Sequence, residues 1–479
     1  MLRFILYHFI FIFSLKNGLA QSLPDSSKTT LSLPDFLNIV KQNHPVAKQS
    51  ALLNRSAQAE LLAAKGGFDP KLYGDYEQKF FDSKNYFSFG EYGVKVPTWY
   101  GIEVKGGYNT ATGNFIDPEN KLPKQGQAIV GISFPLLQNL MMDERRANLF
   151  KAQQAQNFYQ AERDNLINDL AFEAIQTYWK WAFYHQQKLV FDNALRVAQE
   201  RFNAIKTTYE LGDRMAMDTL ESFTQVQDRT FEYNRVQLDV QEANLKLANF
   251  LWGKNAQPMD YFARWQPQTL EDIPLDASIV IPTGRDSILS SEKDILLKNL
   301  IETHPILRGY DVKLNQLEID RKLKREKLKP KLNLNYNFLG NGFNWSNLFT
   351  NNYKWGVAFS SSTLFRSERG DVQLANIKIE NTRLFREQKA LELRNKLQQF
   401  FNETDNLQAQ IQLYRATVSN YQQLLQLENT RFELGESSFF LINSRENKYI
   451  EAQLKLAKLL SEYQIARAAT DWAGGRLGF

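Results

Sequence analysis

The chain has 479 residues, of which 23% are charged and 43% hydrophobic, and its formal net charge is +5. This small net charge gives no reason to expect a strongly charged partner such as nucleic acid. The chain contains no cysteine, which excludes disulfides and a lipid-carrying N-terminal cysteine. Beyond the first twenty residues no stretch is long and apolar enough for a transmembrane helix, so membrane insertion would require a β-barrel.

The first 20 residues differ from the rest of the chain. Arg3 precedes a nearly unbroken apolar run at residues 4–15, and small residues follow it up to Ala20. This pattern predicts a secretory signal peptide that is cleaved before Gln21. We favour it over a membrane anchor, because the apolar run is too short to span a bilayer.

The first half of the mature chain, residues 21–252, begins with short helices and then changes its hydrophobic period. Within a β-hairpin region at residues 69–136, apolar and polar residues alternate, which predicts strands with one apolar face. Long helices are predicted at residues 141–208 and 215–250. The first contains no glycine or proline, and its length corresponds to a rod of about 100 Å. Helices of globular domains average only about 12 residues.

The second half, residues 291–479, follows a linker at residues 253–290 that contains four prolines. Its elements occur in the same order as those of the first half. A β-hairpin is predicted at residues 331–361, and long helices are predicted at residues 367–433 and 437–470. The shared order indicates an internal duplication, which the spacing of matched residues tests.

Short motifs recur in the two halves, with a larger spacing before the strands than after them. The matched pairs are His44 with His304 at 260 residues, Phe134 with Phe359 at 225, and Gly212 with Gly435 at 223. The first half therefore holds about 35 extra residues in its strand region, which is enough for one more hairpin or a large loop. Hairpins in a single chain leave open strand edges, so several copies are expected to combine.

The chain resembles the TolC-type outer-membrane efflux proteins. The resemblance rests on the signal peptide, the twofold order, the segment Ile132-Ser133-Phe134-Pro135-Leu136 and the two Leu-Gly-acidic turns, and it covers essentially the whole mature chain. It implies an α+β membrane protein: a trimeric outer-membrane β-barrel continued by a long periplasmic α-helical barrel, with an internally duplicated protomer. Family members supply four strands per protomer to a 12-stranded barrel. We prefer that count here, with the extra residues as an added hairpin or loop, over an alternative of eighteen strands.

The resemblance also implies a function. It predicts the outer-membrane channel of a tripartite efflux or type I secretion system, located in the outer membrane and extending into the periplasm. Such a channel is a passive conduit for substrates that an inner-membrane RND or ABC transporter delivers. The expected partners are two further copies in a homotrimer, a periplasmic adaptor (membrane fusion) protein, the transporter and outer-membrane lipid. The alternative is a periplasmic coiled-coil adaptor or scaffold, which would not need strands midway along each half.

In the family, the turns after the long helices form periplasmic tips that dock on the adaptor and narrow the entrance. Carried over to this sequence, the tip residues are Leu211, Gly212, Asp213, Arg214, Leu434, Gly435, Glu436 and Ser437. Glycine suits these turns because it accepts positive φ angles. The resemblance therefore predicts two docking tips per chain.

The predicted entrance departs from the family pattern. The acidic entrance positions align with Leu441 and Ser444, so the acidic rings are absent. Asp218 matches an aspartate that latches the closed state, but the arginine expected to pair with it is not at the aligned position. Arg214 or Arg445 is the hypothetical replacement.

No catalytic chemistry is expected. The four histidines lack metal-site spacing, and the sequence holds no nucleophile elbow, phosphate loop or zinc-protease helix. We therefore predict no catalytic residue, metal or cofactor. A group of aromatic residues in the first long helix is interpreted as a packed seam between helices, in preference to a substrate-binding site. Its members are Tyr178, Trp179, Trp181, Phe183 and Tyr184.

Overall fold

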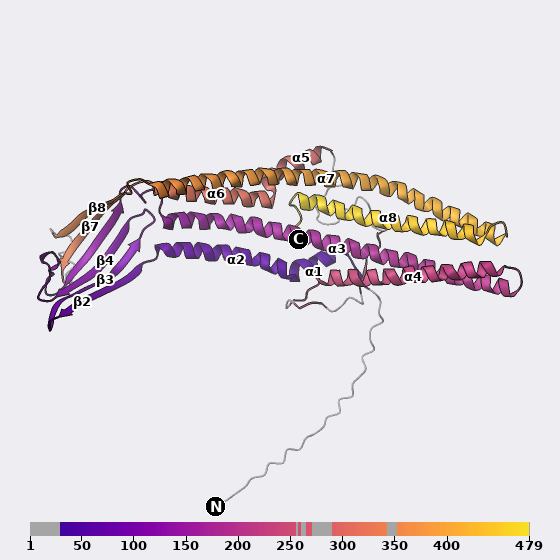
Figure 1. Ribbon diagram of the computed structural model, residues 1–479, viewed down its shortest axis with the longest axis horizontal. Helices are drawn as coiled ribbons and strands as arrows, with labels where there is room; N and C mark the ends of the chain where they lie inside the picture. The colour runs from indigo at the N-terminus through magenta and orange to yellow at the C-terminus, as the bar shows by residue number, and fades with distance from the viewer. Residues whose placement is uncertain (1–28, 255–256, 260–264, 271–289, 343–351, 479) are drawn as a thin grey trace, which may run out of the picture.

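The protein is strongly elongated, with a β-sheet at one end and helices running away from it to two turns at the other end (Figure 1). The computed structural model describes residues 29–254, 257–259, 265–270, 290–342 and 352–478. The expected signal peptide and most of the expected linker lie outside these residues. The C-terminus lies near the middle of the long axis (Figure 1).

Helix α3 (Glu144–Glu210) runs along the whole helical body. The Asp143 side chain caps it by accepting the backbone N–H of Arg146 at 2.8 Å. The other long helices are α2 (Pro45–Lys65), α4 (Ala216–Ala248), α6 (Pro305–Glu326), α7 (Arg366–Glu433) and α8 (Phe439–Ala473). Near the sheet, α2, α3, α6 and α7 lie side by side, and in the far half α4, α3, α8 and α7 do so (Figure 1). The body is thus four helices wide along its length.

The main hydrophobic core lies at mid-length. Here α1 (Leu33–Asn43) packs on α3, and β1 (Thr29–Leu31) pairs in parallel with β6 (Trp265–Pro267). Tyr178 is buried and donates its hydroxyl hydrogen to the Leu31 carbonyl at 2.7 Å. Trp179 and Trp181 are buried in the same core, against which Phe183 and Tyr184 pack. The aromatic group is therefore a packed seam between helices. The short helix α5 (Ser290–Thr303) lies beside α6 and α7.

The terminal sheet contains six antiparallel strands in the order β2-β3-β4-β5-β7-β8. The strands are β2 (Lys71–Phe81), β3 (Lys84–Pro97), β4 (Glu103–Thr112), β5 (Gln127–Pro135), β7 (Lys331–Asn341) and β8 (Tyr353–Ser360). The 3₁₀ turns η1 (Gly66–Phe68) and η2 (Pro118–Asn120) precede β2 and β5. Among the described helices, none has the length and apolar composition needed to cross a membrane.

The sheet has six strands, two more than the four that the resemblance implied for each chain. The extra residues of the first half form β3 and β4, which are inserted between β2 and β5 and hydrogen-bonded on both sides. The sequence analysis missed the first half of β3. The reason is that Phe87 and Phe89 occupy positions where the alternation requires polar residues.

Two histidines, the partly buried His44 and the buried His304, each cap the second helix of one half. The Nδ1 atom of His44 accepts the backbone N–H of Val46 at 3.2 Å, and that of His304 accepts the backbone N–H of Ile306 at 3.2 Å. Each is followed by a proline, whose missing N–H costs nothing at the first helical position. Burial lowers the pKa of His44, and burial with the nearby charge of Lys389 lowers the pKa of His304 to about 4.

The His304 cap makes stability depend on pH. Below about pH 6.5 the unfolded chain binds a proton at His304 that the folded chain, with its pKa of about 4, does not bind. The stability from the neutral cap is therefore present above pH 6.5 and is lost as the pH falls toward 4. Going from pH 7.5 to pH 5, this loss is about 2 kcal/mol.

We expect His304→Asn, which keeps a cap acceptor that does not titrate, to lose that part of the pH dependence in thermal unfolding. The same pH dependence as in the unmodified chain would contradict this account.

Candidate functional site: the sheet faces and the helical tips

One face of the sheet is apolar across all six strands. Paired residues on neighbouring strands share a face, so the register assigns each residue to one side. The apolar face includes Leu72, Tyr76, Tyr92, Val94, Val104, Tyr108, Val130, Ile132, Leu334, Tyr336, Trp355 and Val357. Between the helices and the bulge at Lys79, no described strand residue on this face is charged. Trp355 is 60% exposed, and no helix covers this surface.

The opposite face holds the charged residues of these strands. They are Lys71, Lys79, Lys95, Lys105, Lys331, Lys354, Asp75, Glu77, Glu91 and Glu103. Asn333, Asn335 and Asn337 of β7 lie on the same side. The alternation predicted from the sequence therefore produces one face without charged residues and one face that carries the charges.

A row of six paired residues, four of them lysines, crosses the polar face perpendicular to the strands; we call it the lysine row. In register order it consists of Lys71, Lys95, Lys105, Gly131, Asn337 and Lys354. None of these lysines forms an ion pair with a described carboxylate. Lys95 lies over the Tyr73 ring, with 4.3 Å between its Nζ and the ring centroid. Lys105 lies across Gly131, where a Cβ atom would be 2.8 Å from the Lys105 Cε. Like charges on neighbouring strands destabilise a sheet, so folding stability does not explain this row.

The two turns at the far end of the body have the same geometry. Four backbone hydrogen bonds define them: Gly212 to Tyr209 at 2.9 Å, Asp213 to Thr208 at 3.0 Å, Gly435 to Phe432 at 3.0 Å and Glu436 to Arg431 at 2.8 Å. These are paired Schellman motifs, which need a positive φ at the glycine. The φ angles are +91° at Gly212 and +76° at Gly435. Beside the glycines, Leu211 is 72% exposed and Leu434 is 70% exposed.

Arg214 links the first tip to the second helical pair. Its Nη1 lies 3.7 Å from the Asp218 Oδ2, and its guanidinium carbon lies 4.3 Å from the centroid of the Phe432 ring on α7. Of the two arginines proposed as partners for Asp218, Arg214 makes this contact. Leu441 is exposed on α8 and provides no charge there.

Arg445 belongs to a separate cluster around Glu428. The Arg445 Nε lies 3.6 Å from Glu428, and Ser437 donates its hydroxyl hydrogen to the same carboxylate at 2.5 Å. The hydrogen bond from Ser437, and then the charges of Arg431 and Arg445, lower the pKa of Glu428. Ser444 on α8 is exposed. The second tip is therefore held by an ionised glutamate that the sequence analysis did not single out.

Further from the tips, a buried polar cluster joins α3 and α4 to α8. Glu446 is 4% exposed and accepts hydrogen bonds from Arg201 and, at 3.5 Å, from the Gln225 amide. Arg229 donates to the Asn447 side chain, and burial lowers the pKa of Arg229. Removing one partner of such a pair leaves an uncompensated buried charge. No local sequence pattern indicates this cluster, because Arg201 and Glu446 are 245 residues apart.

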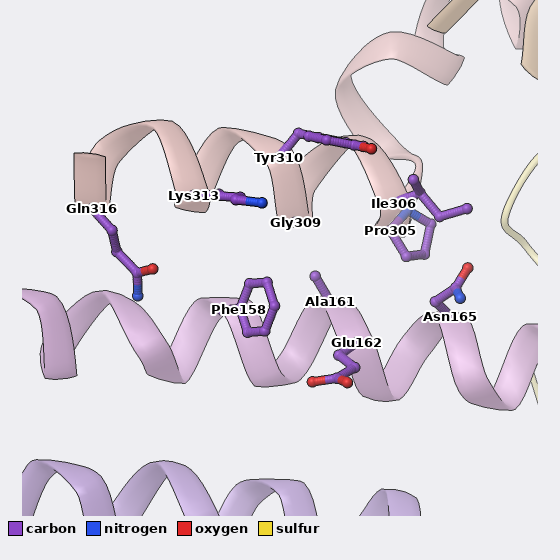
Figure 2. A pocket seen from close by; sticks show the side chains of 10 residues that line it. All are labelled: Phe158, Ala161, Glu162, Asn165, Pro305, Ile306, Gly309, Tyr310, Lys313 and Gln316. Atoms are coloured by element: carbon purple, nitrogen blue, oxygen red, sulfur yellow. The ribbon is translucent and has the colours of Figure 1, made fainter. Parts of the chain in front are cut away.

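A pocket of about 430 Å³ lies between α3 and α6 (Figure 2). Its lining residues are Phe158, Ala161, Glu162, Asn165, Pro305, Ile306, Gly309, Tyr310, Lys313 and Gln316. The lining contains no serine, histidine or cysteine and therefore offers no Ser–His or Cys–His pair. Among the described residues, no three metal-ligating side chains gather in one place. The pocket is a gap between the side chains of two packed helices.

Comparisons with known proteins agree with this arrangement. The model of the family named outer membrane efflux protein matches residues 296–473. A search of the curated proteins finds no match. Among solved structures, the outer-membrane channel OprN has a TM-score of 0.67 and 13% identity, with 93% of this chain and 90% of that chain covered.

Two further structures have the same fold. The open state of the MtrE outer membrane channel of Neisseria gonorrhoeae has a TM-score of 0.65 and 14% identity, covering 93% of this chain and 89% of that chain. The outer membrane protein VceC of Vibrio cholerae has a TM-score of 0.64 and 14% identity, covering 92% and 96%.

The family is one of channel proteins, and the location predicted from the sequence, the outer membrane with an extension into the periplasm, is the location of its members. Residues 296–473 thus carry the sequence pattern of the outer membrane efflux protein family, and the described chain has the fold of the TolC-type outer-membrane channels.

Proposed function

We propose that this protein is the outer-membrane channel of a tripartite efflux or type I secretion system. Three copies form one barrel and one helical tunnel, through which substrates pass without chemical change. The observation that carries this proposal is the sheet with a charge-free apolar face, continued directly by α3 and α7. Each of these helices is long enough, at about 100 Å, to extend far into the periplasm.

The two faces of the sheet support a membrane barrel. The apolar face fits lipid, and the charged face fits a water-filled lumen. In water, the apolar face would remain exposed at a cost of about 25 cal/mol per Å². An exposed apolar face that spans six strands is typical of an interaction site.

A periplasmic coiled-coil adaptor or scaffold is the alternative function. The long helices and their turns would serve that function equally well. The sheet favours the channel, because an adaptor has no use for a continuous lipid-facing surface. The family match also favours the channel.

We also infer that the protomer arose by internal duplication. The two halves share the order of their elements, the histidine caps at His44 and His304, and the Schellman turns at Gly212 and Gly435. Equivalent turns at the same end of the body give each protomer two equivalent tips. A trimer would then present six tips in a ring.

The tips are the proposed docking site for a periplasmic adaptor, which would connect the channel to an inner-membrane RND or ABC transporter. Leu211 and Leu434 project next to the acidic residues Asp213 and Glu436. An exposed apolar side chain with a polar rim is the usual composition of a binding hot spot. The Arg214–Asp218 pair and the Glu428 cluster would hold these tips in the constricted arrangement.

Membrane fractionation tests the proposed function. We expect the processed protein in the outer-membrane fraction, as a trimer that dissociates on gels only after heating. The purified trimer is expected to conduct ions in planar bilayers. A soluble monomer would rule out the channel and leave the adaptor or scaffold.

Neutralising Asp218 tests the role of the Arg214–Asp218 pair. Asp218→Asn removes the charge that holds Arg214, so the open fraction of the channel is expected to rise. A partly exposed pair contributes at most about 1 kcal/mol, which limits the rise to about fivefold per pair. Single-channel conductance measures this fraction. The control is Glu210→Gln, which removes a charge from the same tip outside the pair. Equal conductance of Asp218→Asn and the unmodified channel would rule out a latch at this position.

Neutralising the lysine row tests the orientation of the polar face. If that face lines the lumen, Lys95→Gln with Lys105→Gln removes two positive charges per chain from the ion path. The reversal potential in a KCl gradient is then expected to shift toward cation preference. Replacing the same two residues with arginine keeps the charge and is expected to keep the potential. A glutamine variant with an unchanged potential would mean that the row does not line the path.

A further inference from the structure

We propose that all six strands of each chain enter the membrane barrel, so that a trimer forms a barrel of eighteen strands, with β8 of one copy paired to β2 of the next. This inference rests on the proposed function, in which copies of the chain form a ring. The resemblance alone implied twelve strands, and the added strands are β3 and β4.

The ladders exclude the four-strand arrangement. In a twelve-stranded barrel two neighbouring strands would have to leave the wall. Without β3 and β4, β2 would have to pair with β5, and without β2 and β3, β8 of one copy would have to pair with β4 of the next. One edge of β4 is bonded to β5, and the other is bonded to β3 from Glu103 to Thr112. The far edge of β3 is bonded in turn to β2, where Leu72 pairs with Val94. Among the described strands of this sheet, only β2 and β8 have a free edge.

The composition of the added strands fits the membrane. Tyr92 and Val94 of β3, and Val104 and Tyr108 of β4, continue the apolar face of the other four strands. A hairpin projecting into the extracellular medium would have no need of a charge-free face. The polar face continues as well, since Lys95 and Lys105 lie on the side of the charged residues. Both surfaces of the barrel wall therefore extend over β3 and β4.

The two free edges are compatible with each other. Strand β2 follows α2 and runs away from the helices, and β8 runs back to α7 (Figure 1). When copies are related by rotation, β8 and β2 meet as antiparallel neighbours, as the other strands do. The apolar side chains at both edges are open: Leu72 is 85% exposed and Phe359 is 67% exposed. Two long open edges are a hazard for aggregation, and ring closure removes it.

The width of the sheet matches the width of the helices that continue it. Four helices side by side occupy about 32–40 Å of circumference at the usual spacing of 8–10 Å. Six strands about 4.8 Å apart, tilted by about 35–45°, also occupy about 35–40 Å. Four strands would occupy only about 25 Å. Six strands thus continue the four helices without a step in diameter, and a barrel of this size encloses an open aqueous channel.

Cross-linking tests this closure, because the chain contains no cysteine of its own. A first set of double variants combines one β8 substitution, Trp355→Cys or Val357→Cys, with one β2 substitution, Gly74→Cys or Tyr76→Cys. A second set combines the same β8 substitutions with Val104→Cys or Gly106→Cys on β4. After oxidation in membranes, we expect bonds between copies in the first set and none in the second. Gly74→Cys with Tyr92→Cys joins β2 to β3 and is expected to form a bond inside the chain. Its absence would mean that β3 has left the wall and would overturn the proposal.

A matched control shows that β8 is accessible to oxidation. Tyr336→Cys with Trp355→Cys joins residues that face each other within one chain, so it is expected to form a bond inside the chain. Bonds between β8 and β4 of different copies would overturn the proposal. A heat-modifiable trimer without any β2–β8 bond would also overturn it and leave the channel standing. A soluble monomer would overturn both, and an electron cryomicroscopy map of the trimer counts the strands independently.

Discussion

The continuity of helix α3 is the constraint on which the rest of the structure depends. Near the sheet it contacts α2 and α6, and in the far half it contacts α4 and α8. Its 67 residues contain no glycine and no proline, so its backbone hydrogen bonds continue without a break for about 100 Å. Any kink would change the position of the tips relative to the sheet. The long helices of the second half, α6, α7 and α8, are positioned against this rod or against each other.

The interactions between the helices change along this rod. At mid-length the seam is aromatic and apolar, with Tyr178, Trp179 and Trp181 buried among several elements. Toward the tips the contacts become polar, first the buried Arg201–Glu446 pair and then the partly exposed Arg214–Asp218 pair. Apolar packing holds the middle firmly, whereas charge pairs near water contribute little and respond to single charge changes. This gradient suits a molecule whose proposed moving part is its far end.

The strands lie in the same order as the helices to which they are joined. The helices lie in the order α2, α3, α6 and α7, and the strands joined to them lie in the order β2, β5, β7 and β8. No connection therefore has to cross another. The inserted hairpin β3–β4 lies between β2 and β5, beside the connections to α2 and α3. It widens the sheet without disturbing the helical body.

The sequence by itself determined the features that depend on neighbouring residues. The absence of proline and the scarcity of glycine predict the long helices, the glycines at 212 and 435 predict the turns that need positive φ, and the alternation in β7 predicts a strand with two different faces. The tip residues of the candidate site were carried over from the family resemblance, which left Arg214 and Arg445 as alternative partners for Asp218. Only the tertiary structure decided the features that depend on distant pairing. The number of strands depended on whether β3 and β4 bond to both neighbours. The Glu446 cluster depended on helices that are more than 200 residues apart meeting side by side.

Local patterns specify the conformation of a segment and the composition of its faces. They do not specify which segment it packs against, because that choice is made by packing and hydrogen bonding over the whole chain.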